Sequence, residues 1–307
     1  MKERYFFAVL FILIIFLGFF VKNPFILNML SLSAITLIVV TGLNLLLGFA
    51  GQISLGHAGF VALGAYISAI ASVKFGVNPW IAILIAVFAT EIFAIFIGYP
   101  TLKLKSHYLA MATLAIGEII NIVTNAWVEA TGGPQGFVGI PLLSVFGFAL
   151  DNEVKFYFFI WSLTFILIFL SINLIDSKFG RALKTIKSKE NAAYAFGINV
   201  HLYKMIVFLI SVFYAALAGG LYAFYIGFIS PSSFGLTESI NYITMIVVGG
   251  MGNFVGVFIS SVILSILPNL FASFEDYWPI INGLLLIFVI MFTPNGLKDI
   301  FKWTKKQ

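Results

Sequence analysis

The sequence predicts an all-α fold, that of a polytopic membrane protein with about ten transmembrane helices. Hydrophobic residues make up 61% of the 307 residues, and charged residues only 9%. The mean hydropathy is +1.09. A soluble domain has about a quarter of its residues charged, so a soluble chain of this composition could not cover its surface. Apolar runs long enough to cross a bilayer as helices recur along the chain, without the two-residue alternation of a membrane β-barrel.

Ten apolar segments are read as spans. In order, they are 5–21, 25–48, 57–73, 79–100, 107–125, 155–175, 202–227, 237–250, 254–273 and 278–293. The first follows a charged start, as the apolar core of a signal peptide does. It is long for such a core and no small-x-small cleavage site follows, so we expect a retained span. The eighth is short and polar at both ends, which makes it the weakest of the ten predictions.

The basic residues predict the orientation. With ten spans both termini lie on one side, and placing them inside puts most lysines and arginines inside as well. These inner basic residues are Lys2, Arg4, Lys103, Lys105, Lys178, Arg181, Lys184, Lys187, Lys189, Lys204, Lys298, Lys302, Lys305 and Lys306. Cytoplasmic loops of membrane proteins are enriched in Lys and Arg, so we expect both termini inside. The tryptophans that then fall near the outer interface are Trp80, Trp127, Trp161 and Trp278.

Composition and motifs argue against several functional classes. The chain has no cysteine, which removes disulfides, thiolate nucleophiles and cysteine metal sites. The excess of basic residues, with a net charge of +5, is explained by the lysines and arginines of the inner loops. No nucleic-acid motif is present. The sequence lacks a phosphate-binding P-loop, an H-E-x-x-H metal motif and a G-x-S-x-G nucleophile motif. We therefore expect no catalytic residue, metal or cofactor on this chain, and not an enzyme.

Two connections are longer than the rest, within what reads as one membrane domain over 1–307. The outer loop, about 126–154, contains "EATGGPQGFVGIP". The inner loop, about 176–201, reads "DSKFGRALKTIKSKENAAYAFGINVH". All other connections are short, and no linker or soluble domain separates them.

The inner loop carries the signals of a short helix. Ser188 is a good N-cap, Glu190 suits the first turn, and Gly197 is a natural residue to follow the last turn. We therefore expect a helix over 189–196. Two interpretations remain open at this point: an amphipathic helix that lies on lipid headgroups, or a rigid element that docks into another protein.

A glycine-rich stretch, "GLNLLLGFAGQISLGHAGF" (42–60), interrupts the apolar pattern near the second and third spans. Its polar side chains are Asn44, Gln52, Ser54 and His57. One interpretation is close helix packing, as expected for small pairs such as Gly64 and Ser68. The other is a broken segment whose backbone lines a wet cavity, acting as a path or gate. The span count places the break near the cytoplasmic end, and His57 is either a hydrogen-bonded residue at a helix start or a ligand.

Other polar groups fall inside predicted spans. Glu91 and Glu118 lie in the fourth and fifth, where a carboxylate is costly and usually faces a partner or a cavity. Each is either structural or functional, and Asn121 continues a polar line from Glu118 toward the outer end. "VVGGMGNFVG" (247–256) repeats the features of the 42–60 stretch in miniature and is a candidate inverted-repeat counterpart.

The motifs together resemble a known family. "ENAAYAFGINVHLYK" is similar to the Glu-x-Ala-Ala-x-x-x-Gly loop of ABC-importer permeases. "GLNLLLGFAGQISLGHAGFVALGAY", "TGGPQGFVGIP", "FGRALKTIK", "ENAAYAFGIN" and "VVGGMGNFVG" resemble, in order over about 42–253, permease subunits of branched-chain amino-acid importers of the LivM/LivH type. The TGGPQG loop leans toward the LivM-like half of the pair.

The resemblance implies a function and a set of partners. The inner loop would form a cytoplasmic coupling helix that contacts an ATP-hydrolysing subunit through Glu190, Ala192, Ala193 and Gly197. The implied assembly is a second homologous permease, two ABC ATPase subunits that bind ATP and Mg, and a periplasmic or extracellular solute-binding protein. That protein would dock on the outer loop at Gly132, Gly133, Pro134, Gln135 and Gly136.

The resemblance also implies a location and leaves alternatives. It places the chain in the bacterial or archaeal cytoplasmic membrane as a multi-pass protein without nucleic-acid partners. The expected solute is a branched-chain amino acid, with urea or short amides, and then sugars or nucleosides, as alternatives. A different class, an ion-coupled secondary transporter, would use Glu118 or Glu91 as its proton site.

Overall fold

The computed structural model describes residues 2–21, 23–104, 106–145, 148–150, 152–270 and 278–292. Its long helices are α1 (Lys2–Phe20), α2 (Pro24–Leu43), α3 (His57–Phe75), α4 (Pro79–Thr101), α5 (Ser106–Ala126), α7 (Glu153–Asp176), α10 (Val200–Ile226), α11 (Leu236–Gly249), α12 (Phe254–Leu270) and α13 (Trp278–Phe292). The short helices are α6 (Val128–Thr131), α8 (Lys178–Ser188) and α9 (Glu190–Ala195). A π-helix (Asn44–Phe49) continues α2, and 3-10 turns lie at Gly133–Gln135 and Pro231–Phe234.

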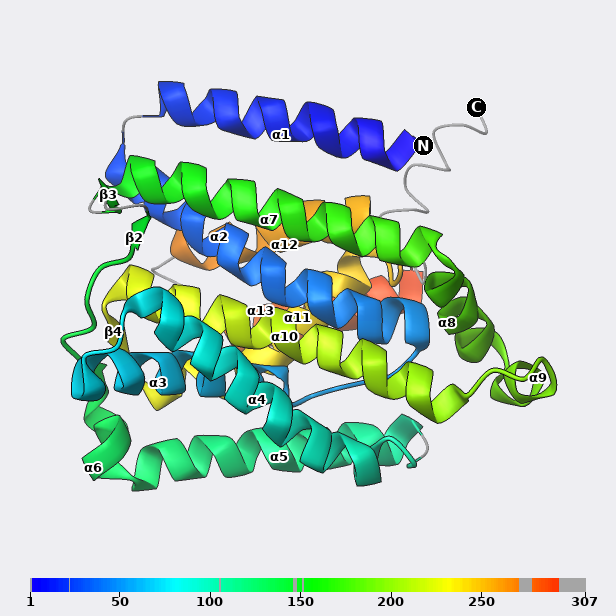
Figure 1. Cartoon of the computed structure of the whole chain (residues 1–307). Helices are drawn as coiled ribbons and strands as arrows, with labels where there is room; N and C mark the ends of the chain where they lie inside the picture. Colours follow the sequence, from blue (N-terminus) through cyan, green and yellow to red (C-terminus); the bar gives the residue numbers. More distant parts are fainter. Residues whose placement is uncertain are drawn as a thin grey trace. The chain divides into compact units, whose positions relative to one another are not determined.

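Sheet structure is confined to two-residue strands in the described residues. They are β1 (Phe137–Val138), β2 (Ser144–Val145), β3 (Phe148–Ala149) and β4 (Phe228–Ile229). β1 pairs antiparallel with β4, with Phe137 opposite Ile229, and β2 pairs antiparallel with β3. The predicted all-α class is therefore confirmed (Figure 1).

A helix occupies each of the ten predicted spans. By length and composition, six helices of the described chain can cross a membrane: Pro24–Phe49, His57–Phe75, Pro79–Thr101, His107–Ala126, Glu153–Asp176 and Val200–Ile226. α1, α12 and α13 contain shorter apolar helices. α11 has 14 residues, which is about 21 Å of helix against a hydrocarbon core of about 30 Å. The segment predicted with least support is thus the shortest of the ten long helices in the described residues.

The chain divides into two compact units, each built from segments far apart in sequence. The first unit contains Met1–Phe49, Asn152–Arg181 and Asn241–Gln307, and the second contains Ala50–Asp151 and Ala182–Ile240.

In the first unit, α2 packs against α7 and α12, and α1 lies along α7 (Figure 1). The hydroxyl of Tyr157 donates to the carbonyl of Ile14, 2.8 Å away. Trp161 is 1% exposed and its ring contacts those of Phe165 and Phe258. Trp161, predicted near the outer interface, is therefore packed inside the unit, with Phe165 of its own helix and Phe258 of α12 against its ring.

In the second unit, α10 packs against α3 and α4, and α3 also packs against α5. A side chain at Gly64 of α3 would collide with the backbone of Ala216, and one at Gly219 of α10 would collide with the carbonyl of Val61. The two backbones can therefore approach only because both positions are glycine. Ser68 is fully buried, which confirms the predicted small-residue packing face.

Some predictions fall on residues outside the described ranges. These are the inner lysines Lys105, Lys298, Lys302, Lys305 and Lys306, and the ends of the last two predicted spans. The outer loop is described except for 146–147 and 151.

Candidate functional site

The short helix of the inner loop is present and is closed at its C-terminal end as predicted. Gly197 adopts the left-handed region with φ +73°. Its N–H donates to the carbonyl of Tyr194, and the N–H of Ile198 donates to the carbonyl of Ala193, both at 3.0 Å. This pair of bonds is a Schellman motif, which satisfies carbonyls that the last turn leaves free.

The N-terminal end of this helix differs from the prediction. Ser188 is the last residue of α8, and Lys189 takes the N-cap position with no side-chain hydrogen bond. The helix α9 runs Glu190–Ala195 rather than 189–196. The reason is that α8 extends through Ser188, so the chain has only one extended residue, Lys189, in which to turn between the two helices.

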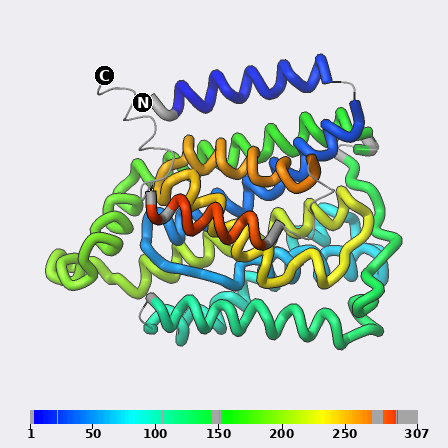
Figure 2. Tube along the Cα trace, turned by 180° about the vertical axis from the view of Figure 1, so that it is seen from behind, coloured from blue at the N-terminus to red at the C-terminus, as the bar shows by residue number. Residues whose placement is uncertain are grey.

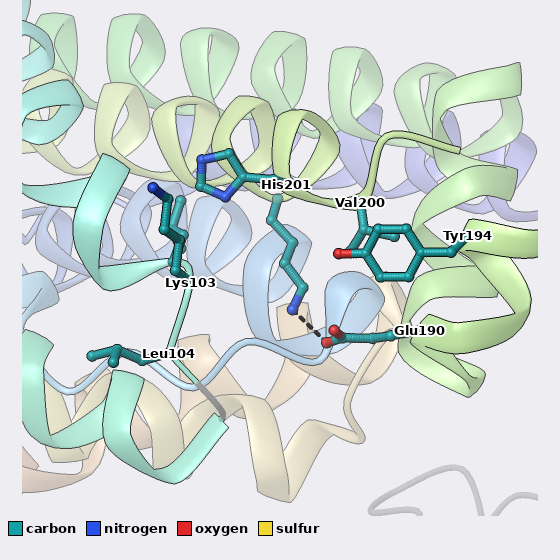
Figure 3. Close-up of a pocket in the computed structure, with 8 residues that line it drawn as sticks. Lys103, Leu104, Glu190, Tyr194, Val200 and His201 are labelled. Carbon is teal, nitrogen blue, oxygen red and sulfur yellow. Dashed lines mark hydrogen bonds and ion pairs between the residues drawn. The ribbon is translucent and has the colours of Figure 1, made fainter. Parts of the chain in front are cut away.

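An ion pair and a small apolar cluster hold α9 against the start of α10. Glu190 pairs with Lys204 Nζ (Figure 3); Lys204 is 9% exposed, whereas half of the Glu190 side chain is exposed. One turn further along α9, Ala193 is fully buried against Ile186 and Val200. The position and tilt of α9 are therefore fixed from within the chain.

The four predicted contact residues of this loop have different environments. Ala193 is buried and packs internally, so it is unavailable to a partner in this arrangement. Ala192 is partly exposed, and Glu190 and Gly197 are exposed. The largest apolar groups that α9 presents are Tyr194 and Phe196, 58% and 79% exposed. Sequence reasoning missed these two, although exposed aromatics on a basic loop are an available signal.

The glycine-rich stretch contains an uncoiled segment, 51–56, between the π-helix and α3 (Figure 2). Both ring nitrogens of His57 are hydrogen-bonded: Nδ1 to Ser54 Oγ at 2.8 Å and Nε2 to Ser211 Oγ at 2.6 Å. His57 is fully buried. Of the two interpretations for His57, this geometry favours the residue that starts a helix over the ligand, because neither nitrogen is free.

The same stretch contacts α5 through glycines and α11 through a serine. A side chain at Gly56 would collide with the carbonyl of Thr113, and one at Gly59 would come within 2.9 Å of the Gly117 Cα. The N–H of Ala58 donates to Ser239 Oγ at 3.0 Å. A helix start leaves backbone N–H groups free, and here a side chain from another helix satisfies one of them.

The break extends further into the helical bundle than the span count indicated. A side chain at Gly51, near the start of the segment, would lie 3.2 Å from Lys187 Cγ of α8, so this end lies at the inner loop. His57, at the other end, meets Ser211 near the middle of α10. Ser211 is about 16 Å along the helix from Val200, which is about half the thickness of a hydrocarbon core. Close packing and non-helical backbone thus occur together in one segment.

The buried side-chain amides of Gln52 and Asn44 differ in their hydrogen bonding. Gln52 is 3% exposed, and neither atom of its side-chain amide has a partner among the described residues. In the first unit, Asn44 Oδ1 accepts from the N–H of Gly252 at 3.0 Å. A side chain at Gly48 would come within 2.5 Å of the same Gly252 nitrogen. The two glycine-rich stretches, 42–49 and 247–256, therefore meet through Asn44 and Gly252.

Glu118 lines a small groove in the second unit, which in this arrangement is too narrow to hold a water molecule. The groove is formed by Leu55, Gly59, Leu114, Gly117, Glu118, Phe234, Gly235, Leu236 and Ser239. Glu118 is partly exposed, whereas Asn121 Nδ2 donates to the carbonyl of Pro231 at 2.9 Å. The predicted polar line thus separates into a carboxylate that faces a groove and an amide that ties α5 to the turn before α11. Glu91 of α4 is partly buried.

The outer loop forms a compact turn. Gly132, Gly133 and Gly136 have positive φ of 78°, 60° and 82°, a region that favours glycine. A side chain at Gly136 would come within 2.5 Å of the Phe228 ring of β4. The turn buries Gly133 and exposes Pro134 and Gln135.

Two structural residues could not have been found from local patterns. Ser211 and Ser239 bond to the start of α3 from 154 and 181 residues away. A single serine in an apolar helix carries no signal of its distant partner. Lys204 was counted only as an inner basic residue, and its pairing with Glu190 is likewise a tertiary event.

Comparisons with known proteins point to one family. The family described as "Branched-chain amino acid transport system / permease component" matches residues 25–291. The high-affinity branched-chain amino acid transport system permease protein LivM of Escherichia coli is 30% identical, over 96% of this chain and 75% of its own length. A probable LivM of Methanocaldococcus jannaschii is 25% identical, over 85% of this chain and 89% of its own.

A second permease protein of the same transport system matches at lower identity. The LivH permease protein of Escherichia coli is 24% identical, over 91% of this chain and 95% of its own length. No solved structure matches the chain significantly. Among the described residues, no group of three or more His, Cys, Asp or Glu side chains is placed to hold a metal ion.

Proposed function

The chain belongs to the permease family of branched-chain amino-acid transport systems, and from this premise we propose that it translocates branched-chain amino acids as the membrane subunit of an ATP-driven importer. It is a transport subunit and a multi-pass protein of the inner membrane. The observation that carries the proposal is the family match over 25–291, with 30% identity to a LivM protein over 96% of the chain. The leaning toward LivM agrees with the TGGPQG turn of the outer loop.

The proposed assembly pairs this chain with a second, homologous permease and with two ABC ATPases that bind ATP and Mg. The ATPases would dock on α9. The rigidity of α9 supports this role, because the Glu190–Lys204 pair and the packing of Ala193 let a push on the helix reach α10 directly. Tyr194 and Phe196 supply exposed apolar surface, and aromatic side chains of this kind often anchor interfaces.

The outer loop is the proposed docking site for an external solute-binding protein. Its glycines hold a fixed turn that exposes Pro134 and Gln135. A preformed turn loses little conformational entropy on binding, which supports the choice of this loop over the short connections.

The 51–56 segment and the Glu118 groove are proposed to act on the solute path. His57, Ser54 and Asn121 would hold the segment and its neighbours in place through the hydrogen bonds described above. Glu118, which faces the groove, and Gln52, whose amide has no partner among the described residues, are the proposed polar groups of the path.

Uptake by reconstituted protein tests the proposed function. We expect vesicles that contain both permeases, the ATPases and the binding protein to accumulate labelled leucine only when ATP is supplied on the ATPase side. Vesicles without the ATPases are the control. Accumulation driven by a proton gradient in that control would refute the proposal and favour a secondary transporter.

A charge reversal tests the docking role of α9. We expect Glu190→Lys to abolish ATP-coupled uptake while the protein still reaches the membrane, because the change reverses the exposed charge and opposes Lys204. Normal uptake by this variant would contradict the docking role. The exchange Glu190→Lys with Lys204→Glu restores an internal pair, so recovery of uptake would assign Glu190 to anchoring α9 rather than to touching the ATPase.

A further inference from the structure

A cavity of about 430 Å³ lies between the end of α4 and the start of α10. Its lining comes from the turn after α4, from α9 and from the first residues of α10: Leu102, Lys103, Leu104, Glu190, Tyr194, Val200, His201 and Lys204 (Figure 3). Cavities of about 300–1,000 Å³ are of the size that binds small ligands. All of these residues belong to the second unit.

The lining favours an anion. It contains two lysines and one histidine against a single carboxylate, Glu190, which Lys204 already neutralises. Lys103 therefore brings an uncompensated positive charge to the cavity. The Nε2 atom of His201 is buried and has no hydrogen-bond partner in the described part of the chain. The N-terminal end of α10, a 27-residue helix, adds the positive end of its dipole.

One aromatic side chain connects this cavity to an apolar surface. The Tyr99 ring lies under Lys103 Nζ, 4.4 Å from its centroid, and contacts the edge of His201 with centroids 5.4 Å apart. Tyr99 also ends a row of exposed residues on one face of α4. The row, hereafter the α4 stripe, is Phe88, Ile92, Phe96 and Tyr99, with exposed fractions of 69%, 50%, 82% and 58%.

The α4 stripe has the spacing of a single helix face. Steps of four, four and three residues keep side chains on one side of a helix. Lys103, which follows the end of α4, places its Nζ over the ring of Tyr99 at the end of this row. A lipid-facing helix ends in this way, with apolar residues, then an aromatic residue at the interface, then a lysine that extends to the headgroup level.

We propose that this cavity binds the phosphate of an anionic phospholipid whose acyl chains lie along the α4 stripe. Lys103 and His201 contact the phosphate, and the start of α10 faces it. The stripe decides between a lipid and a soluble phosphate, because only a lipid uses the cavity and the apolar surface together. The headgroup then lies beside the Glu190–Lys204 pair that holds α9, so the lipid contacts the same loop that is proposed to receive the ATPases.

The test measures phospholipid binding to the intact, detergent-purified importer by native mass spectrometry. The probes are phosphatidylglycerol, phosphatidylcholine and inorganic phosphate. We expect a preference for phosphatidylglycerol that falls at least fivefold in Lys103→Gln/His201→Gln, since one basic residue near anionic lipid contributes about fivefold in affinity. Lys178→Gln removes an exposed charge of α8 outside the cavity and is the matched control, expected to keep the preference.

The variant Phe96→Ser tests the α4 stripe. It should weaken phosphatidylglycerol binding and leave any binding of inorganic phosphate unchanged. Lys103→Gln alone, at an exposed side chain, gives the same comparison if the double variant does not assemble. The proposal is overturned if the preference survives the loss of Lys103 and His201, or falls equally in Lys178→Gln. It is also overturned if inorganic phosphate displaces the lipid and Phe96→Ser has no effect, which would identify a soluble ligand.

Discussion

The hydrogen bond between His57 and Ser211 is expected to hold the start of α3 near the middle of α10, and Ser211→Ala tests this. The substitution removes one hydroxyl and leaves His57 Nε2 buried without a partner. His57 and Ser211 are both fully buried, so water cannot replace the lost group. The second ring nitrogen keeps its bond to Ser54, so the imidazole cannot turn away without losing that bond too.

The expected cost follows from this geometry. Side-chain hydrogen bonds between membrane helices contribute on average only about 0.6 kcal/mol. Leaving a buried polar group unsatisfied costs more, about 1–3 kcal/mol. Because Ser211→Ala leaves His57 Nε2 unsatisfied, we expect about 1–3 kcal/mol of destabilisation. For a chain of this size, each kcal/mol lowers the unfolding midpoint by about 2–4 °C.

The assay is thermal unfolding of the detergent-purified importer, followed by tryptophan fluorescence. The matched control is Ser162→Ala in α7. The Ser162 hydroxyl donates to the carbonyl of Phe158 in its own helix, at 2.7 Å, so its removal leaves no donor or acceptor without a partner. We expect this control to unfold within about 1 °C of the unmodified protein.

A double-mutant cycle then isolates the interaction energy between His57 and Ser211. His57→Leu with Ser211→Ala should cost less than the sum of the single changes, because no unsatisfied nitrogen remains. The reasoning is refuted if Ser211→Ala unfolds together with Ser162→Ala, or if the two single changes are additive.

Two further predictions concern packing and topology. Gly219→Ala should destabilise the protein by about 1–3 kcal/mol because the added carbon overpacks against Val61. The control is Gly283→Ala in α13, where no described atom lies within 4 Å of the new carbon, and it should be neutral or slightly stabilising. Equal unfolding midpoints for the two variants would contradict the close approach of α3 and α10. Single cysteines at Gln135, which is exposed in the outer turn, and at Lys187, in a chain that has no other, should react with an impermeant maleimide from opposite sides of the membrane. Labelling from one side would overturn the span count.

The helices were predictable because their signals are local. Asn23 and Asn78 cap α2 and α4, each followed by proline, and each accepts a hydrogen bond from a backbone N–H two residues later. The left-handed Gly197 likewise follows from the sequence next to it. Apolar length, a capping side chain and a terminal glycine each act within a few residues, so a single sequence contains them.

The contacts between helices were not predictable, since nothing local specifies them. Ser188 had the chemistry of an N-cap, but α8 continued through it and Lys189 took the position. Trp161 had the sequence position of an interfacial residue, yet Phe258 of α12 packs against its ring inside the first unit. For Trp161 the deciding partner lies in another element, so tertiary packing overrode a local preference.

The 51–56 segment connects the inner loop to the middle of α10. At one end Gly51 has φ +71° and lies against Lys187 of α8, in the loop proposed to receive the ATPases. At the other end, His57 is bonded to the middle of α10. α8 leads directly into α9, which Glu190 ties to the start of α10. The inner loop therefore contacts the start of α10 through α9 and is connected to the middle of α10 through the 51–56 segment. We expect a displacement of the loop to act on α10 at both positions, and so to tilt the helix rather than only translate it.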